Sequence, residues 1–279
     1  MTELPAATRL GAIRLRVGDE DALRRFYENT IGLRAVPGDS GLVSLGVDGT
    51  PLVELVADPD APARPPRTTG LFHLALLVPS RSDLARALRR VVDSGWQLTG
   101  ASDHLVSEAL YLADPEGNGI ELYRDRPRDE WPRMGETLRM DTLPLDLESL
   151  LTEADDAGGG MADGTSLGHV HLQVGDLAAA ETFWVESLGF DVTVRGYPGA
   201  LFISAGGYHH HLGLNTWAGE GVQEPPPGSR GLVHFELLLP DEQAVEESAA
   251  RLERVASVEC RDGGVLARDP SGNVVLARS

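Results

Sequence analysis

The sequence predicts an α+β protein built from four βαβββ modules. Two observations predict this class: the chain repeats itself internally, and each repeat passes from a strand-like to a helix-like pattern. The stretch LGAIRLRVGDEDALRRFYENTIGL (Leu10–Leu33) aligns without a gap with LGHVHLQVGDLAAAETFWVESLGF (Leu167–Phe190). Each predicts an alternating strand, an aspartate near the start of an amphipathic helix, and a glycine that ends the helix.

A second pair of repeats follows the same plan. GLFHLALLVPS (Gly70–Ser80) resembles GLVHFELLLPD (Gly231–Asp241), and a helix is expected after each. Both copies end in a turn and a strand, DPEGNGIEL and DPSGNVVLA, and short strand-like runs precede these endings. The four modules are predicted at residues 8–60, 70–125, 166–217 and 230–279.

The modules predict two domains and a connector. The N-terminal domain, residues 1–125, holds modules 1 and 2, and the C-terminal domain, residues 166–279, holds modules 3 and 4. Residues 126–165 break the repeat pattern, begin with a charged, proline-containing stretch and end in a glycine-rich one. They are predicted to form a connector.

Composition restricts the partners. The formal charge is −19, from 24 basic and 43 acidic residues, which disfavours nucleic acid and anionic membrane surfaces. No apolar run approaches the roughly 20 residues that span a bilayer, and the N-terminus lacks a signal-peptide pattern. Cys260 is the single cysteine, which fits a reducing cytoplasm. We expect a cytoplasmic protein with a small-molecule ligand, and leave open whether it forms a homo-oligomer.

Glu121 occupies an unusual place in the stretch DHLVSEALYLADPEGNGIELY (Asp103–Tyr123). It stands between Ile120 and Leu122 in an apolar strand. Because successive side chains of a strand face opposite ways, Glu121 could lie on a solvated face. The alternative is that it faces a site that needs a carboxylate.

The same stretch resembles the signature of extradiol ring-cleaving dioxygenases. That signature has a histidine, five to seven residues, an apolar residue and a tyrosine, two residues, Asp-Pro-x-Gly, two or three residues, and a glutamate. Here His104, Leu110-Tyr111, Asp114-Pro115-Glu116-Gly117 and Glu121 fit it, while Ser102 departs from the residues usual two places before the histidine. With its four modules, the chain resembles the vicinal oxygen chelate superfamily of glyoxalases, bleomycin-type resistance proteins and extradiol dioxygenases, and most of all the two-domain catechol 2,3-dioxygenases.

The resemblance implies both a fold and a site. Modules pair into two half-open barrels, each able to surround a metal with ligands from the first and last strands. Glu121 is then an iron ligand, with His104 and Tyr111 beside the substrate. Two histidines and one carboxylate leave open positions on Fe(II) for a diol and O₂.

Aligning the modules gives candidate ligands. The first-strand positions are Ala12, His73, His169 and His234. The last-strand positions are Glu54, Glu121, His211 and Leu276. If neighbours pair, neither half holds two first-strand histidines with the glutamate. If modules 2 and 3 pair instead, His73, His169 and Glu121 meet as the metal set, and modules 1 and 4 keep a vestigial set.

Several residues keep alternative interpretations. His73 alone could be a packed core histidine. By strand alternation His209 and His211 share one face, and we expect His211 to be the acid–base histidine, with His209 as the alternative. His171 lies on the face of His169 and could support the metal or contact substrate. Asn215 and Trp217 continue the strand expected to begin at His209 and are candidate pocket wall.

The implied function is Fe(II)-dependent extradiol cleavage of a catechol-type small aromatic diol with O₂. A glyoxalase-type isomerase or transferase, using Zn²⁺, Ni²⁺ or Mn²⁺ with His211 as a fourth ligand, is the first alternative. A non-catalytic drug-binding protein of the same fold is the second. The intact signature argues against a binding protein, and only metal content and open coordination positions separate the two enzymes.

Overall fold

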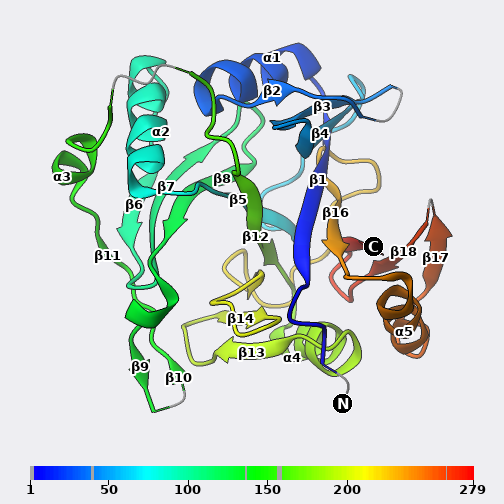
Figure 1. Cartoon of the computed structure of the whole chain (residues 1–279). Coiled ribbons are helices and arrows are strands. Elements are labelled where there is room, and N and C mark those ends of the chain that lie inside the picture. Colours follow the sequence, from blue (N-terminus) through cyan, green and yellow to red (C-terminus); the bar gives the residue numbers. More distant parts are fainter. Residues whose placement is uncertain (1–2, 39–40, 136, 156–158, 262) are drawn as a thin grey trace. The chain divides into compact units, whose positions relative to one another are not determined.

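The computed structural model describes residues 3–38, 41–135, 137–155, 159–261 and 263–279. Along these residues the order βαβββ occurs four times (Figure 1). Helices are few and the strands form mixed sheets, with parallel and antiparallel neighbours. The predicted α+β class and the four modules are therefore confirmed.

The elements of each module have the following bounds. Module 1 comprises β1 (Arg9–Val17), α1 (Glu20–Phe26), the π-helical η1 (Tyr27–Ile31), β2 (Arg34–Ala35), β3 (Val43–Val47) and β4 (Thr50–Ala57). Module 2 comprises β5 (Gly70–Leu77), α2 (Arg81–Asp93), β6 (Gly100–Asp103), β7 (Ser107–Ala113) and β8 (Gly119–Asp125). Module 3 comprises β12 (Ser166–Gln173), α4 (Leu177–Glu181), the π-helical η3 (Thr182–Ser187), β13 (Asp191–Val194), β14 (Ala200–Ser204) and β15 (Leu212–Asn215). Module 4 comprises β16 (Gly231–Leu238), α5 (Glu242–Leu252), β17 (Val258–Arg261), β18 (Gly264–Arg268) and β19 (Val274–Arg278).

The connector is more ordered than a simple linker. It holds a short 3-10 helix, three two-residue strands and one short α-helix: η2 (Arg128–Glu130), β9 (Arg133–Met134), β10 (Thr137–Leu138), β11 (Leu143–Pro144) and α3 (Leu147–Leu151). Strand β11 pairs antiparallel with β6 of module 2. The connector therefore extends the sheet of the module that precedes it.

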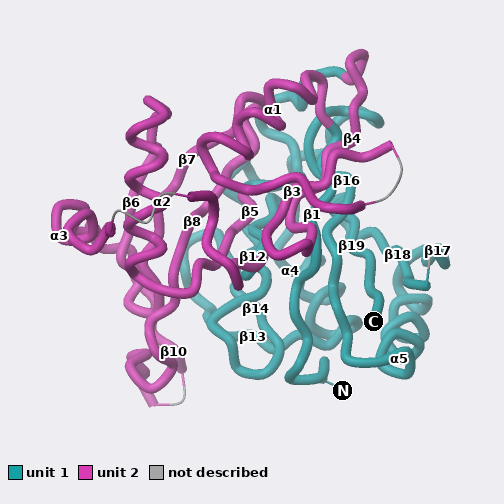
Figure 2. Tube along the Cα trace, turned by 45° about the horizontal axis from the view of Figure 1, so that its top comes forward, with its two compact units in different colours: residues 1–16, 62–72, 168–279 teal, residues 17–61, 73–167 magenta. Residues whose placement is uncertain are grey.

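The chain divides into two compact units (Figure 2). Unit 1 comprises Met1–Arg16, Pro62–Phe72 and Gly168–Ser279, and unit 2 comprises Val17–Ala61 and His73–Leu167. Within unit 1, hydrogen-bonded neighbours follow the orders β17-β18-β19-β16-β1 and β12-β15-β14-β13. Within unit 2 the orders are β4-β3-β2 and β11-β6-β7-β8-β5.

Modules 1 and 4 pair through their first strands. In unit 1, β1 runs antiparallel to β16, with Arg14 opposite His234. Also in unit 1, the ring of Phe72 at the start of β5 packs edge-on against His171 of β12, with centroids 5.3 Å apart. The first pairing agrees, for the first strands, with the predicted partnership of modules 1 and 4, and the second contact agrees with that of modules 2 and 3.

These strand contacts also explain why the compact units differ from the domains expected at residues 1–125 and 166–279. Segments 1–16 and 62–72 belong with the C-terminal modules because their strands bond or pack there. The grouping of the modules into those two domains stays a prediction.

The α-helix of each module begins where its sequence supplies a cap. The carboxylate of Asp19 accepts from the backbone N–H of Ala22, and that of Asp176 accepts from Ala178 and Ala179. Ser80 and Asp241 cap the helices of modules 2 and 4 in the same way. Such caps satisfy backbone donors that a helix start leaves unpaired. The predicted aspartates at the helix starts of modules 1 and 3 are confirmed.

A buried aspartate organises the turn before β8. Asp114 is 4% exposed, and its Oδ1 accepts from the backbone N–H groups of Glu116 and Asn118, both at 2.9 Å. Its Oδ2 accepts from Asn118 Nδ2 at 2.8 Å and from the hydroxyl of Tyr27 at 3.3 Å. Burial raises the pKa of Asp114, while the hydrogen bonds from Asn118 and Tyr27 oppose that rise.

The turn before β19 repeats this arrangement inside unit 1. Asp269 Oδ1 accepts from the N–H groups of Ser271 and Asn273, and Oδ2 accepts from Asn273 Nδ2 at 3.1 Å. Trp184 Nε1, from the π-helix of module 3, donates to the same Oδ2 at 3.1 Å. In each unit, an aromatic side chain of one module therefore donates a hydrogen bond to the turn of a second module.

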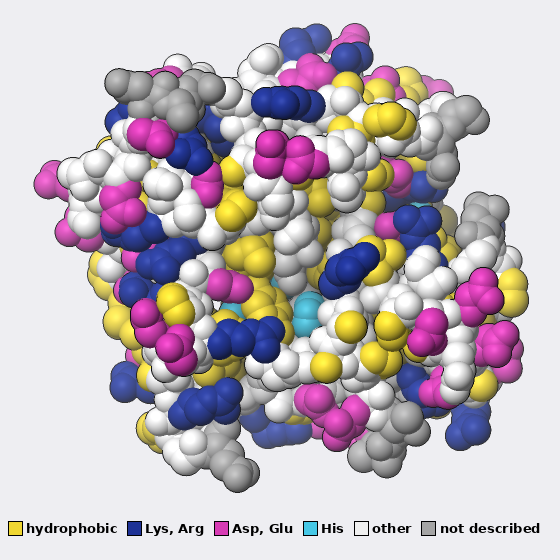
Figure 3. Space-filling model, viewed as in Figure 1, with side chains coloured by type: hydrophobic (Ala, Val, Ile, Leu, Met, Phe, Trp, Pro, Cys, Tyr) yellow, Lys and Arg dark blue, Asp and Glu magenta, His cyan; other side chains and the backbone are white. Residues whose placement is uncertain are grey.

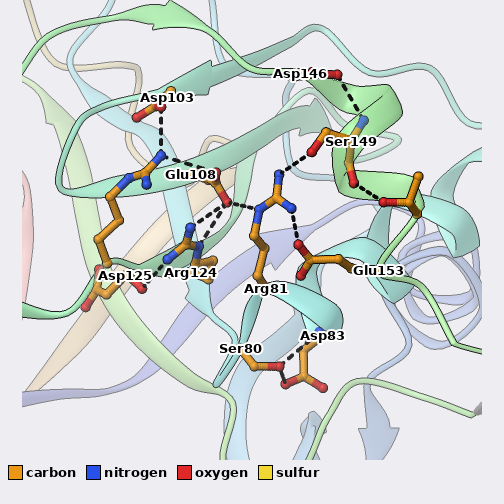
Figure 4. Close-up of polar contacts among 12 residues, drawn as sticks. Ser80, Arg81, Asp83, Asp103, Glu108, Arg124, Asp125, Asp146, Ser149 and Glu153 are labelled. Carbon is orange, nitrogen blue, oxygen red and sulfur yellow. Dashed lines mark hydrogen bonds and ion pairs between the residues drawn. The ribbon is translucent and has the colours of Figure 1, made fainter.

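A second buried carboxylate, Glu108 on β7, lies among three arginines (Figure 4). It accepts from Arg81 Nε at 2.8 Å, from Arg124 Nε at 2.9 Å and from Arg126 Nη2 at 3.3 Å. One buried carboxylate thus accepts from guanidinium groups of α2, β8 and the start of the connector, and Asp103 and Glu153 pair with two of these groups as well. Such a group is stable only while its charges stay paired.

Arg81 extends this group of charges to the connector. Its guanidinium also donates to Glu153, just after α3, and to the hydroxyl of Ser149 on α3 at 3.4 Å (Figure 4). The short helix α3 buries Leu150 but is too brief to be stable alone. Its ion pair with Arg81 is part of what holds it on module 2.

Charged side chains of both signs are interspersed on the face shown in Figure 3. All of the basic residues are arginines, and several pair with nearby carboxylates, for example Arg195 with Glu181 at 2.6 Å. No helix of the described residues is both long and apolar enough to cross a bilayer.

We expect Tyr27→Phe to destabilise the protein by about 1–2 kcal/mol at neutral pH, since it removes a hydrogen bond to a buried carboxylate. That bond lowers the pKa of Asp114, so its loss raises the folded-state pKa further. The destabilisation is present while Asp114 is ionised and shrinks as the pH falls through that pKa. Urea unfolding at pH 7 and at about pH 4 measures this. An equal loss at both pH values would contradict the Tyr27–Asp114 bond.

We expect Glu108→Gln to destabilise the protein by about 3–5 kcal/mol, because three arginines lose their shared buried counter-charge. The matched control is Glu259→Gln, which removes an exposed partner of Arg261 and should leave stability nearly unchanged. Chemical denaturation of both variants measures the difference. Equal stability of the two variants would show that the Glu108 group is not what stabilises this region.

Candidate metal centre

Two buried ligand-type side chains meet in unit 2. Strands β5 and β8 run parallel, with His73 opposite Gly119 and Ala75 opposite Glu121. Residues two apart along a strand share a face, so His73 and Glu121 point to the same side. His73 Nε2 lies 3.0 Å from Glu121 Oε2, and the two residues are 6% and 3% exposed.

The burial of Glu121 decides between its two interpretations. Ile120 and Leu122 are fully buried on the opposite face of β8, against the core. Glu121 itself is not solvated, so the interpretation of a wet strand face is wrong. A buried carboxylate is costly unless it is paired or bound to a cation.

The signature tyrosine and histidine stand next to this pair. Tyr111 on β7 is opposite Glu121 in register, and its ring centroid is 5.8 Å from that of His73. The Tyr111 hydroxyl lies 2.6 Å from His104 Nε2. The structure therefore brings His73, His104, Tyr111 and Glu121 together in unit 2.

The tautomer of His104 follows from its other contact. His104 Nδ1 lies 2.8 Å from the carbonyl oxygen of Asp141, in the connector. A carbonyl oxygen only accepts, so Nδ1 carries a proton and donates. In the neutral ring Nε2 must then accept, and the donor is the Tyr111 hydroxyl.

Unit 1 holds the remaining histidines. His169 on β12 is 1% exposed, and its ring lies 4.1 Å, centroid to centroid, from that of His210. His209 is 6.1 Å from His169 by the same measure. The Nδ1 atoms of His209 and His210 are 2.7 Å apart, so one ring donates to the other.

The predicted alternation of the histidine triplet is wrong. His209, His210 and His211 lie in the loop before β15, which begins only at Leu212. The loop starts at Gly206 and Gly207, whose φ angles of 61° and 67° suit glycine. Strand periodicity does not apply there, and His210 rather than His211 packs on His169.

The module alignment also needs correction at the last strand of module 3. His171 pairs with Gly213 as Ala75 pairs with Glu121, so Gly213 and not His211 is the equivalent of Glu121. The alignment of module 1 with module 3 was extended without a gap to the last strand, where it set Glu54 opposite His211. It fails there because the two loops differ in length: only residues 48–49 separate β3 from β4, whereas residues 205–211 separate β14 from β15.

Gly213 has a steric role. A Cβ at this position would come within 2.6–2.8 Å of ring atoms of His171. The imidazole of His171 therefore covers the place at which module 2 carries its carboxylate.

His211, Asn215 and Trp217 have distinct surroundings. His211 Nδ1 accepts from the backbone N–H of Ala205, and its ring packs near Phe190 and Tyr208. Asn215 is fully buried, and its Oδ1 accepts from the N–H of Trp217 at 3.1 Å. The ring of Trp217 lies 5.1 Å from that of His171.

Three residues near these histidines were missed by the sequence reasoning: His210, Phe72 and Phe202. Phe202 packs against both His210 and His171. The glycine pair before the triplet was the signal for a loop that could have shown His210. Nothing in the sequence marks Phe72, which neighbours His73 and looks like an ordinary strand residue.

Module 4 shows why the other set of positions is unsuited to a cation. His234 is buried, and burial together with Arg14, Arg278 and Arg261 lowers its pKa to about 4. Glu236 on the same strand face accepts from the N–H of Ala12 and pairs with Arg278 at 3.2 Å. The three arginines disfavour a metal ion beside His234, and the carboxylate of Glu236 is already paired with Arg278, in keeping with the vestigial role expected for His234.

The chain is similar in sequence to two dioxygenases. It is 40% identical over 277 residues to a catechol-2,3-dioxygenase of Bacillus subtilis (strain 168), covering 97% of this chain and 96% of the relative. It is 30% identical over 158 residues to a biphenyl-2,3-diol 1,2-dioxygenase 3 of Rhodococcus globerulus, covering 54% and 83%.

Solved structures agree at the level of the fold. A Bacillus subtilis protein superposes with a TM-score of 0.67 at 14% identity, covering 99% of this chain and 86% of that one. Glyoxalase I of Zea mays gives 0.59 at 17% identity, covering 97% and 92%. These likenesses confirm the predicted fold of half-open barrels.

The family profile described as the Glyoxalase/Bleomycin resistance protein/Dioxygenase superfamily matches residues 9–122 and 166–276, which together include all four modules except the edges of the first, second and last. On this evidence the chain belongs to that superfamily.

Proposed function

We propose that this protein is an Fe(II)-dependent extradiol dioxygenase that opens the ring of a catechol-type small aromatic diol with O₂. The observation that carries the proposal is the buried His73–Glu121 pair, 3.0 Å apart, beside the linked Tyr111 and His104. The relatives named as catechol and biphenyl-diol dioxygenases support the same reaction class.

His73, Glu121 and His169 are the proposed metal ligands, each through one atom. The donor chemistry fits: two imidazoles and one carboxylate suit Fe(II) and leave positions for other ligands, and Mn²⁺, Zn²⁺ or Ni²⁺ could bind the same donors. A cation would also neutralise the buried carboxylate of Glu121. Bound iron would supply the redox chemistry between the diol and O₂.

Tyr111 and His104 are proposed to bind the diol. Because the Tyr111 hydroxyl donates its hydrogen bond to His104, the phenolic oxygen keeps lone pairs that can accept a hydrogen bond from a substrate hydroxyl. The Asp141 carbonyl fixes the His104 ring, so the pair is oriented before substrate arrives. Their role is to hold and orient a hydroxyl proton at the Tyr111 oxygen.

The acid–base histidine stays a choice between His209 and His211, and we favour His209. His209 exchanges a hydrogen bond with His210, whose ring packs on His169. His211 uses its Nδ1 to accept from the backbone and packs among aromatic rings. An imidazole titrates in the range needed to take up and return a substrate proton.

His171 and Trp217 are proposed as pocket wall, and Asn215 as the residue that positions Trp217. His171 packs between Phe202 and Trp217. Asn215 acts on the wall through its hydrogen bond to the Trp217 backbone.

The glyoxalase-type alternative receives less support. It needs a fourth protein ligand, and the register position that would supply one from module 3 is Gly213. We further propose a cytoplasmic setting, with the small aromatic diol and O₂ as substrates. Whether the chain forms a homo-oligomer is left open.

The test of the function is anaerobic reconstitution of the purified protein with Fe(II), followed by air and a panel of catechols. We expect a yellow ring-opened product from at least one catechol, with O₂ consumed in equal amount. A reconstituted protein that leaves every catechol intact while isomerising a hemithioacetal would favour the glyoxalase-type reaction instead.

We expect Glu121→Gln to lower bound iron by at least about tenfold, because an amide oxygen is a far weaker ligand than a carboxylate. The matched control is Glu54→Gln, a buried carboxylate on the corresponding strand of module 1, which should keep its iron. Metal analysis after reconstitution and desalting gives the stoichiometry. Full iron in Glu121→Gln would rule out Glu121 as a ligand.

A further inference from the structure

We infer that Asp103 is a positioning residue for substrate binding. Its carboxylate, held by Arg126, fixes the turn that directs His104 toward Tyr111. This inference rests on the proposed function, in which His104 and Tyr111 bind the diol, and it adds a residue to that site. It is carried by residues 103–107 between β6 and β7 in unit 2, which we call the His104 turn.

His104 lies outside the strands, so strand alternation does not set the direction of its side chain. Strand β6 ends at Asp103 and β7 begins at Ser107, whereas Tyr111 lies within β7. The backbone N–H of His104 donates to the carbonyl of Ser107 at 2.8 Å. A side chain outside regular structure keeps one direction only if contacts hold the backbone that carries it. The contacts of the His104 turn therefore decide whether the imidazole meets Tyr111 before substrate arrives.

The residue after His104 has a backbone conformation that needs support. Leu105 has a φ of 70°, in the left-handed region. Among the described residues other than glycine, only Asp48 and Arg67 also have positive φ. A leucine is disfavoured in this region because its Cβ crowds the following carbonyl group. Such a conformation persists where the surrounding contacts hold it.

Asp103 supplies one of these contacts from the other side of His104. Its Oδ1 accepts from the backbone N–H of Leu105 at 2.8 Å. An aspartate that bonds to the backbone two residues further on closes a small turn and fixes the residue between the two. The residue between Asp103 and Leu105 is His104, so this one hydrogen bond acts directly on the backbone that carries the imidazole.

Arg126 holds the carboxylate of Asp103 in place. Its Nη2 donates to Asp103 Oδ2 at 2.8 Å and to Glu108 Oε1 at 3.3 Å, and Figure 4 shows Asp103 and Glu108 bonded to the same guanidinium. The backbone N–H of Arg126 donates to the carbonyl of Val106, within the His104 turn, at 2.8 Å. Arg126 therefore contacts this turn through both its side chain and its backbone.

The partners of Asp103 explain why a carboxylate stands at this position. Oδ1 meets a backbone donor and Oδ2 meets a guanidinium, so both atoms have to accept. An asparagine could still accept from Leu105, but its amide N–H₂ would then face the guanidinium of Arg126. The side chains of Asp103 and Arg126 are 24% and 27% exposed, so solvent ions screen their charges only in part.

The position of the turn matters because the His104 ring makes two short contacts. Nδ1 lies 2.8 Å from the carbonyl oxygen of Asp141, and Nε2 lies 2.6 Å from the Tyr111 hydroxyl. Hydrogen bonds weaken steeply when their geometry is lost, so a displaced turn would break one of these contacts. Without the Asp141 bond the neutral ring is free to change tautomer, and Nε2 then no longer accepts from Tyr111. Asp103 thus acts on substrate through His104 and not by touching it.

The experiment compares Asp103→Ala and Asp103→Asn with the wild-type protein after Fe(II) reconstitution, by iron analysis and by anaerobic calorimetric titration with catechol. We expect Asp103→Ala to keep its iron and to bind catechol at least about fivefold more weakly, because its binding group is misplaced. Asp103→Asn should fall between the two. The control Asp19→Ala removes a carboxylate that accepts from a backbone N–H at the start of α1, and it should bind catechol as the wild type does.

A second measurement reads the His104 ring directly in the metal-free protein. NMR of isotope-labelled histidine at about pH 8 shows which nitrogen of a neutral imidazole carries the proton. The His104 signals are identified by their loss in His104→Gln. We expect the proton on Nδ1 in the wild type and in Asp19→Ala, and a mixture of both tautomers in Asp103→Ala.

Wild-type affinity for catechol in a folded Asp103→Ala variant, or an unchanged His104 tautomer, would overturn the inference. Loss of iron from Asp103→Ala would also overturn it, since the effect would then reach the metal site as a whole. If Asp103→Ala does not fold, Asp103→Asn decides, and its equality with the wild type in both measurements overturns the inference. Failure of the proposed function looks different: the wild-type protein cleaves no catechol, while the tautomer of His104 still responds to Asp103→Ala.

Discussion

The structure depends on two buried aspartates, each of which closes a turn and joins two modules. Asp114 and Asp269 accept four hydrogen bonds each, three from their own turn and one from an aromatic donor of another module. A carboxylate in such a place is tolerated only because every lone-pair direction is used. The turn then delivers the last strand in fixed register, and in module 2 that register places Glu121 beside His73.

The Asp-Pro-x-Gly-Asn part of the signature thus has a structural explanation separate from catalysis. Both turns have it, but only the turn of module 2 is followed by a glutamate. In module 4 the corresponding residue is Leu276, opposite Glu236 in register. The motif by itself therefore identifies a fold element, and the glutamate after it is what the proposed metal site adds.

Much of this could be predicted from the sequence, for reasons that differ from residue to residue. Repeats, strand alternation and helix caps are local patterns, so the modules and the starts of their helices were found. The His73–Glu121 pair was found because both lie in regular strands. The loop of His209 to His211 was misplaced, since its backbone follows two glycines rather than a strand period. Phe72 and Phe202 were missed because an aromatic residue in a strand carries no sign of which side chains it will touch.

The connector has a larger part in the site than its composition suggests. Strand β11 pairs with β6, Arg81 holds the end of α3, and the carbonyl of Asp141 orients His104. A point mutation does not remove a backbone carbonyl. The orientation of His104 therefore depends on where the backbone of Asp141 lies and not on the side chain at that position. An insertion or deletion within residues 137–146 would therefore move the Asp141 carbonyl and change the orientation of His104, although His104 and Tyr111 themselves stay the same.

The covering of Gly213 by His171 has a consequence for how the repeats can have diverged. At one register position, one copy carries a carboxylate and the other has no side chain at all, and a neighbouring imidazole occupies the space. The two copies therefore differ at the position that would carry the carboxylate, although their backbones pair in the same register. Any side chain placed at Gly213 would first have to displace the ring of His171.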